Sequence, residues 1–224
     1  MSTILKKRYQ SPNPALNVHR RSESVATDTV FSDTPAVDNG ATIAQFFVGT
    51  DSRVCDAYPM KSSKQFVNTL EDNIRQRGAM NKLVSDSAQV EISAKVNDIL
   101  RTLCIDSWQS EPYYQHQNPS ERRFGTVKTT TNTVLDRTGA PPSTWLLCLL
   151  YVIFVLNNTF CTTLNAIPMQ RLQGSTTDIS PLLCFRFWEE VYYRHDDSDF
   201  PSDTREGHGH FVGISEHCYH AMNF

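Results

Sequence analysis

Three segments rich in β-branched and aromatic residues follow one another near the start of the chain, and they constrain its fold most. They span residues 25–31, 41–48 and 53–60, and the turn-forming sequences at 38–40 and 49–52 separate them. Strand-forming runs bounded by turn residues at this spacing are typical of antiparallel strands joined by hairpins. The sequence therefore predicts a three-stranded antiparallel sheet at this end of the chain.

Beyond the third strand the pattern alternates between helix and strand. A capping box at Ser62 and Gln65 precedes apolar residues at every fourth position, and Gly78 supplies a stop, so we expect a helix over residues 63–77. The elements expected next are a strand at 83–84, a helix over 90–103, a strand at 105–108, a helix from Pro119 and a buried helix over 143–157. This order predicts an α/β domain with a mixed five-stranded sheet flanked by helices.

Length and composition limit the class of protein. The 224 residues suffice for one domain of average size with appendages. The most apolar run, residues 145–156, is shorter than the roughly 20 residues that a membrane span needs, so we expect a core helix and no membrane. The amino terminus lacks the apolar segment of a signal peptide. Six scattered cysteines without a C-x-x-C pair argue against a disulfide scaffold or zinc ribbon and predict reduced, mostly buried thiols in an intracellular protein.

Charge divides the chain unevenly. Residues 1–177 hold eighteen Lys and Arg against fifteen acids, a net of +3, whereas residues 178–224 hold three against nine, a net of −6. The basic part suits contact with phosphates. We expect a flexible basic arm over residues 1–24, a core over 25–158 and a partial appended module over 159–224. The arm is either a leader without a role or a segment that touches nucleic acid.

Three acids occupy matching places in the expected elements. Asp28 lies in the middle of the first strand, Asp86 at the end of the fourth and Glu121 at the start of a helix. Carboxylates are hard oxygen ligands suited to Mg²⁺ or Mn²⁺. Two such ions about 3.5–4 Å apart can activate an attacking oxygen and stabilise a leaving one in phosphoryl transfer. Single acids are more often turn or solvated residues, and we assign that role to Asp33, Asp38 and Asp51.

The sequences around these acids resemble the catalytic core of retroelement integrases, which are DDE recombinases with an RNase H-like fold. The resemblance runs from about Val25 to Asn158. Asp86 and Glu121 are 35 residues apart, the spacing of the retroviral and retrotransposon branch. The matching segments are Thr27-Asp28-Thr29 with its hairpin partner at 44–49, then Val84-Ser85-Asp86-Ser87, then Gln117-Asn118-Pro119-Ser120-Glu121-Arg122.

The tail adds a second resemblance. Residues 165–174, 200–202 and 209–216 are similar to the segment that follows the core in copia-type polyproteins, which implies a retrotransposon origin. The sequence departs from the family where Ser87 and Ala88 follow the second acid, a place that usually holds Asn-Gly or Asn-Ala. The family's amino-terminal His-His-Cys-Cys zinc module is not visible either.

The resemblance implies roles for individual residues. Asp28, Asp86 and Glu121 would bind two Mg²⁺ or Mn²⁺ ions. Lys128 lies seven residues after Glu121 on the same helix face and would touch the end of the element DNA. Gly125 stands where the family often has another basic residue. Arg122 and Arg123 would contact DNA phosphates, or else belong to a solvated helix face.

Three functions fit this reading. The first is DNA integration, in which a 3′-hydroxyl of element DNA attacks a phosphodiester of target DNA and water processes the element end. The second is an inactive integrase fragment that binds nucleic acid or a partner without turnover. The third is an RNase H-type nuclease with the same fold and metals. An active protein is expected to form a homo-oligomer and to work on DNA in the nucleus.

Overall fold

The expected order of strands and helices is present in the structure, a computed structural model. It describes residues 18–85, 93–109, 119–175, 178–194, 206–215 and 221–223. The elements of the core are β1 Ser24–Phe31, β2 Ile43–Gly49, β3 Cys55–Met60, α1 Phe66–Arg77, β4 Lys82–Ser85, α2 Ala94–Thr102, β5 Asp106–Gln109, α3 Pro119–Thr138 and α4 Trp145–Asn158.

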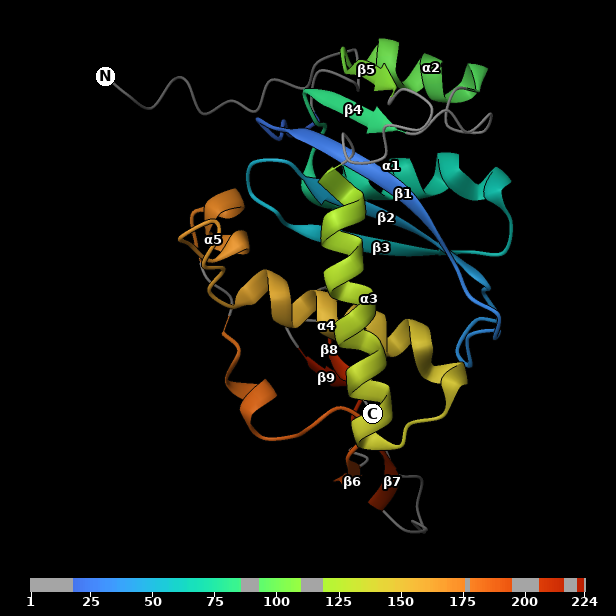
Figure 1. Cartoon of the computed structure of the whole chain (residues 1–224), viewed down its shortest axis with the longest axis vertical. Helices are drawn as coiled ribbons and strands as arrows, with labels where there is room; N and C mark the ends of the chain where they lie inside the picture. Colours follow the sequence, from blue (N-terminus) through green and yellow to red (C-terminus); the bar gives the residue numbers. More distant parts are fainter. Residues whose placement is uncertain are drawn as a thin grey trace, which may run out of the picture.

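These strands form one mixed sheet in the order β3-β2-β1-β4-β5 (Figure 1). The pairs β1–β2 and β2–β3 are antiparallel, while β1–β4 and β4–β5 are parallel. The five-stranded mixed sheet predicted from the sequence is therefore confirmed. Strand β1, which carries Asp28, lies in the middle of the sheet next to β4. Asp86 follows the last residue of β4 in the sequence.

Helices cover both faces of the sheet, and large side chains of β2 pack against the helices on each face. Phe46 packs in a core with α3 and α4, whereas the next residue, Phe47, packs in a second core with α1 and α2. Successive side chains of a strand point to opposite faces, which explains the division. The result is a three-layer sandwich with a core on each side of the sheet.

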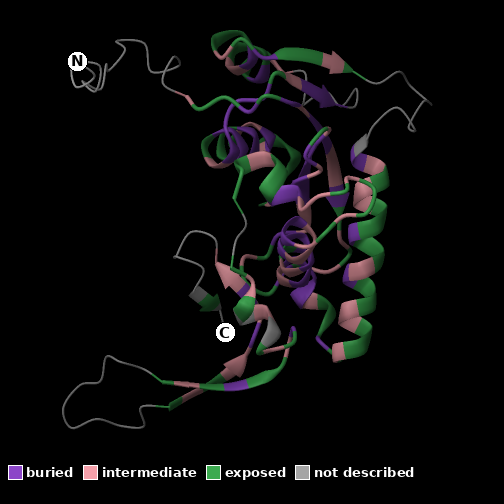
Figure 2. Cartoon of the chain, turned by 90° about the vertical axis from the view of Figure 1, so that its left-hand side faces the viewer, coloured by how far each residue is buried: buried purple, intermediate pink, exposed green. Residues whose placement is uncertain are grey.

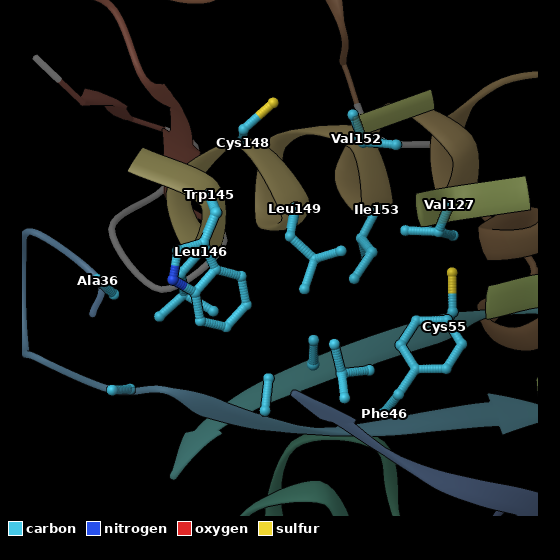
Figure 3. Packing of buried hydrophobic residues seen from close by; sticks show 14 of the residues in the cluster. Ala36, Phe46, Cys55, Val127, Trp145, Leu146, Cys148, Leu149, Val152 and Ile153 are labelled. Atoms are coloured by element: carbon cyan, nitrogen blue, oxygen red, sulfur yellow. The ribbon is translucent and has the colours of Figure 1, made fainter. Parts of the chain in front are cut away.

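Helix α4 is the apolar centre of the first core. Figure 3 shows Leu146, Leu149 and Ile153 of α4 facing Phe46 and Cys55 of the sheet. All five of these side chains are buried. The core helix expected over residues 143–157 is confirmed, with a 3₁₀ turn at Pro142–Thr144 before it. No helix in the described ranges is long and apolar enough to cross a membrane.

The start of the first helix differs from the capping box expected there. A 3₁₀ turn over Ser63–Gln65 precedes α1, and the side chain of Ser62 makes no capping hydrogen bond. Oε1 of Gln65 accepts instead from the backbone N–H of Lys61 at 2.6 Å. The expected stop is confirmed, since Gly78 has φ +97° and its N–H donates to the carbonyl of Ile74.

Residues 18–24 lie against the sheet, although the sequence placed them in a flexible arm. Arg21 is buried and its Nε donates to Glu23 Oε1 at 2.6 Å. The guanidinium of Arg20 donates to the carbonyl of Leu103. The rest of the expected arm, residues 1–17, lies outside the described residues.

The carboxyl-terminal part packs on α4 through aromatic rings. It contains α5 Pro168–Gln173, the hairpin β6 Glu190–Arg194 with β7 Glu206–His210, and the short strands β8 Gly213–Ser215 and β9 Ala221–Asn223. Tyr151 of α4 contacts Phe187 and Phe211, with ring centroids 5.3 and 6.5 Å apart. The sequence of this part also predicts strands at residues 187–193 and 210–214; the first is found as β6, and the second is divided between β7 and β8. The hairpin extends from the body at the end far from α2 (Figure 1).

Candidate active site and adjoining groove

Asp28 occupies the middle of the central strand, as the sequence predicted. Its side chain is half-buried, between a buried Thr27 and a half-buried Thr29. Asp28 Oδ1 accepts a hydrogen bond from the N–H of Thr29 at 2.8 Å. The strand thus presents a carboxylate that is held by its own backbone and is still reached by solvent.

Glu121 lies in the first turn of α3, also half-buried. The positive end of the helix dipole stabilises a carboxylate there. The preceding residue, Ser120, is fully buried, and its hydroxyl donates to the carbonyl of Thr27 at 3.4 Å. That bond joins the start of α3 to β1 at the residue before Asp28, so two of the three predicted acids come from adjoining elements.

The remaining predicted acid, Asp86, lies outside the described residues, as do Gln117 and Asn118 of the segment that precedes Glu121. The structure describes β4 as far as Ser85, which precedes Asp86 in the sequence, and β4 runs parallel to β1 with Val84 opposite Ala26. Within the described ranges, no three His, Cys, Asp or Glu side chains are arranged to hold a metal ion.

The predicted basic residues separate along α3. Lys128 is exposed, and Figure 2 shows exposed residues along the length of α3. Arg122 is exposed, while Arg123 is half-buried and its Nη2 donates to the carbonyl of Leu156 at 3.4 Å. Nε of Arg123 is buried and has no hydrogen-bond partner among the residues that the structure describes. Arg122 and Arg123 share a groove with Glu121, and Lys128 lies two turns beyond it.

This groove, here called the arginine groove, has a volume of about 710 Å³. Three segments form its walls: the first turns of α3, the end of β2 with the β2–β3 turn (residues 49–54), and the segment that follows α4. Its lining residues are Val48, Gly49, Thr50, Arg53, Glu121, Arg122, Arg123, Thr126, Cys161 and Thr163.

A buried network fixes the β2–β3 turn. Glu23 Oε2 accepts from the N–H groups of Asp51 and Ser52 at 3.0 and 2.8 Å, and Glu23 Oε1 accepts from the Ser52 hydroxyl at 2.7 Å. Burial acts to raise the pKa of Glu23, but the charge of Arg21 and the hydrogen bonds from Ser52 lower it below its ordinary value. One wall of the groove is therefore anchored by an ionised, buried carboxylate.

Cysteines near the groove differ in chemistry. Burial raises the pKa of the Cys55 thiol to about 11. Burial acts in the same direction on the partly exposed Cys161, but N–H groups of Leu164 and Thr163 and the charges of Arg123 and Arg53 lower its pKa. Cys161 is therefore the more reactive thiol of the two. The five cysteines that the structure describes are free, but only Cys55 and Cys148 are buried, so the expectation of mostly buried thiols is not met among them.

Several residues that shape the site were not found from the sequence. Asn157 is fully buried, and its side chain accepts from the N–H of Cys55 at 3.0 Å and donates to the Cys55 carbonyl at 2.7 Å, which fixes the end of α4 to β3. Arg53 and Glu23 were missed as well. The partners of these residues are distant in the sequence or depend on the geometry of a turn. No local sequence pattern therefore predicts the roles of these residues.

Comparison with known proteins identifies the fold. No family model and no curated protein matches the sequence. Solved structures do match: the HTLV-2 integrase catalytic core domain in complex with magnesium, in its trimeric form, aligns with 67% of this chain and 96% of its own, at 14% identity and a TM-score of 0.54. This chain has the RNase H-like fold of an integrase catalytic core.

Two further structures support the same fold. The dimeric form of the HTLV-2 core with magnesium covers 68% of this chain and 96% of its own, at 14% identity and a TM-score of 0.52. A chain of the simian T-cell lymphotropic virus intasome, solved with the PP2A regulatory subunit B56 gamma, aligns with 92% of this chain and 75% of its own, at 16% identity and a TM-score of 0.58. The integrase fold thus accounts for the sheet and helices that carry Asp28 and Glu121.

Proposed function

We propose that the chain is the catalytic core of a retrotransposon integrase of the copia type, which joins element DNA to target DNA by metal-dependent phosphoryl transfer. The hydrogen bond from Ser120 to the carbonyl of Thr27 is the observation that supports this most. It places Glu121 and Asp28, the next residue along in each segment, on adjoining elements of an integrase fold. The sequences around both acids also resemble those of the integrase family.

In this proposal Asp28, Asp86 and Glu121 would hold two Mg²⁺ or Mn²⁺ ions. The donors fit such ions, because Asp28 and Glu121 offer hard carboxylate oxygens that are only half-buried. When bound, the ions activate the attacking oxygen and stabilise the leaving oxygen. The N–H of Thr29 donates to Asp28, and the positive end of the α3 dipole favours a negative charge at Glu121.

The basic residues would bind and orient the DNA. Lys128 would pair with a phosphate at the element end, and Arg122 and Arg123 with phosphates nearer to Glu121. We further propose that the active protein is a homo-oligomer and works in the nucleus, where target DNA lies. The HTLV-2 cores that share its fold were solved in dimeric and trimeric forms.

A strand-transfer assay tests the proposal. The chain, a short duplex that carries the element end, a target plasmid and Mn²⁺ are incubated, and joined product is measured. We expect Glu121→Gln to lower product by at least about a hundredfold, because the loss of a metal ligand removes several kcal/mol of transition-state stabilisation. Glu71→Gln, at an exposed position of α1, serves as the matched control.

The pattern of products distinguishes the candidate functions. Joined product from the wild type and the control, but not from Glu121→Gln, supports integration. Cleavage of an RNA–DNA hybrid without joining would indicate a nuclease. Failure of the wild type to join DNA under conditions in which an active relative does so would indicate a fragment that binds without turnover.

A further inference from the structure

Arg53 is an arginine in an unusual backbone conformation at the edge of the arginine groove. Its φ is +60°, in the left-handed region that residues other than glycine seldom adopt. The N–H of Arg53 donates to the carbonyl of Gly49 at 3.1 Å, and the network around Glu23 holds the two residues before it. Such backbone strain persists only where the surroundings enforce it, and it is concentrated at functional positions.

The guanidinium of Arg53 is available to a ligand. It is half-buried at the groove wall and makes no hydrogen bond or ion pair with any residue in the described part of the chain. An arginine at a strained turn costs free energy, and fixing its long side chain costs further rotamer entropy. A favourable contact of its charge with a ligand would offset these costs.

The opposite walls carry complementary donors. Arg122 and Arg123 face the same groove from α3, and Arg123 is anchored by the carbonyl of Leu156 while its Nε lacks a partner. Against these three arginines, the part of the lining that the structure describes has one acid, Glu121. The groove is therefore electropositive and would attract an anion.

The remaining lining indicates the kind of anion. Thr50, Thr126 and Thr163 contribute hydroxyl groups. None of the described lining residues is aromatic, so the walls that they form offer no surface on which a base would stack. Arginine forks and hydroxyls are groups that contact sugar and phosphate without reading sequence.

We propose that the arginine groove binds the sugar–phosphate backbone of a DNA strand, and that Arg53 is a phosphate-binding residue supplied by the β2–β3 turn. This inference rests on the proposed function for the identity of the strand. A strand that crosses the groove passes beside Glu121, and Arg53 and Arg123 hold its phosphates from two sides. The β2–β3 turn then acts as a fixed clamp, because Glu23 anchors its backbone from within the core.

DNA binding without divalent metal tests this proposal apart from catalysis. The affinity for a short labelled duplex is measured by fluorescence anisotropy over a range of salt concentrations. We expect Arg53→Gln to weaken binding by about tenfold, as loss of a charge-assisted hydrogen bond would. The slope of log K against log salt should fall by about 1. Arg53→Lys should recover most of the affinity, and Arg75→Gln, at a 78% exposed side chain on α1, should have no effect.

A footprint on the unaltered protein gives an independent readout. Cys161 lines the groove, whereas Cys104 and Cys184 are exposed elsewhere. Bound DNA should slow alkylation of Cys161 severalfold and leave the rates at Cys104 and Cys184 unchanged, as measured by mass spectrometry of the labelled peptides.

Two results would overturn the proposal: equal affinity and salt slope for wild type and Arg53→Gln, or an unchanged rate at Cys161 when DNA is bound. These failures are separate from failure of the proposed function. If strand transfer occurs but Arg53→Gln does not change DNA binding, the proposed function stands and the proposed role of Arg53 is wrong. If DNA protects Cys161 but no joined product forms, the groove binds DNA and the proposed integrase activity is wrong.

Discussion

At the scale of single residues, Glu23 shows how a buried charge can fix the backbone of a surface turn. Both of its oxygens accept hydrogen bonds, and its partners include the buried Arg21 and the backbone of the β2–β3 turn. Breaking a buried pair costs more than the pair itself is worth, because the remaining charge has lost its partner. The turn that presents Arg53 is thus coupled to the stability of the core.

We expect Glu23→Gln to lower the free energy of unfolding by roughly 3–5 kcal/mol, since Arg21 would be left as an unpaired buried cation. Urea unfolding followed by tryptophan fluorescence measures the change. Glu71→Gln, on the exposed face of α1, should stay within about 0.5 kcal/mol of wild type. Equal effects of the two substitutions would contradict the role given to Glu23.

The pH dependence of stability should follow the same group. The pKa of Glu23 is lowered in the folded protein, so its contribution is fully present above the ordinary value of 4.5 and is lost as pH falls through the lower folded value. Wild type should therefore lose more stability below pH 4.5 than Glu23→Gln does. Urea midpoints measured across this range report the difference, and parallel curves for the two proteins would count against it.

At the scale of elements, two glycines illustrate opposite demands on α3 and the groove wall. Gly125 lies in the interior of α3, and a Cβ there would meet nothing within 4 Å. Gly49 ends β2, and a Cβ there would lie 2.6 Å from the carboxylate oxygens of Glu23. Glycine costs stability in the helix and is required in the strand.

We expect Gly125→Ala to raise the free energy of unfolding by roughly 0.5–1 kcal/mol, the difference in helix propensity between the two residues. Gly49→Ala should lower it, because the added methyl group would displace the buried Glu23 carboxylate from its partners. Thermal unfolding of the pair measures both changes. A stabilising Gly49→Ala would show that the turn network has been described incorrectly.

Most elements of the core could be predicted from the sequence, because local signals agree with the tertiary structure. The turn at 38–40 and the fourfold apolar repeat of α1 specify their elements directly. The capping box at Ser62 was wrong because a 3₁₀ turn intervenes and Gln65 bonds to Lys61. Helix α5 was missed because its six residues are too few to show a period.

At the scale of the whole molecule, the carboxyl-terminal part is attached to the core by a small aromatic cluster. Phe211 is fully buried, with ring contacts to Tyr151 and Phe185, and it exchanges backbone hydrogen bonds with Trp188 and Glu189. Phe211 thus joins the tail to α4, together with Phe187, whose ring also contacts Tyr151. Apolar contact of this kind, rather than a continuous sheet, holds the two parts together.

We expect Phe211→Ala to loosen the tail, at a cost of roughly 3–5 kcal/mol in the stability of that part. Limited proteolysis should then cut residues 178–215 well before the core and faster than in wild type. Tyr192→Ala, at a side chain that is 77% exposed, should leave the cleavage pattern unchanged. Cleavage of the core and the tail at the same rate would contradict a separately docked tail.

The candidate site could be predicted in part. Asp28 and Glu121 could be proposed because the sequence around each resembles that of the integrase family, and the structure brings their elements together. Arg53 was missed because its role depends on a positive φ and on a network between residues up to 29 positions apart. Contacts of that range leave no local pattern in a single sequence.

A crystal structure of the chain soaked in Mn²⁺ tests the central claim most directly. We expect two anomalous peaks about 3.5–4 Å apart, bonded to carboxylate oxygens of Asp28, Asp86 and Glu121. Glu121→Gln should weaken or remove at least one peak. Well-ordered side chains of all three acids, facing away from one another and without Mn²⁺ between them, would contradict the proposal that they form a two-metal site.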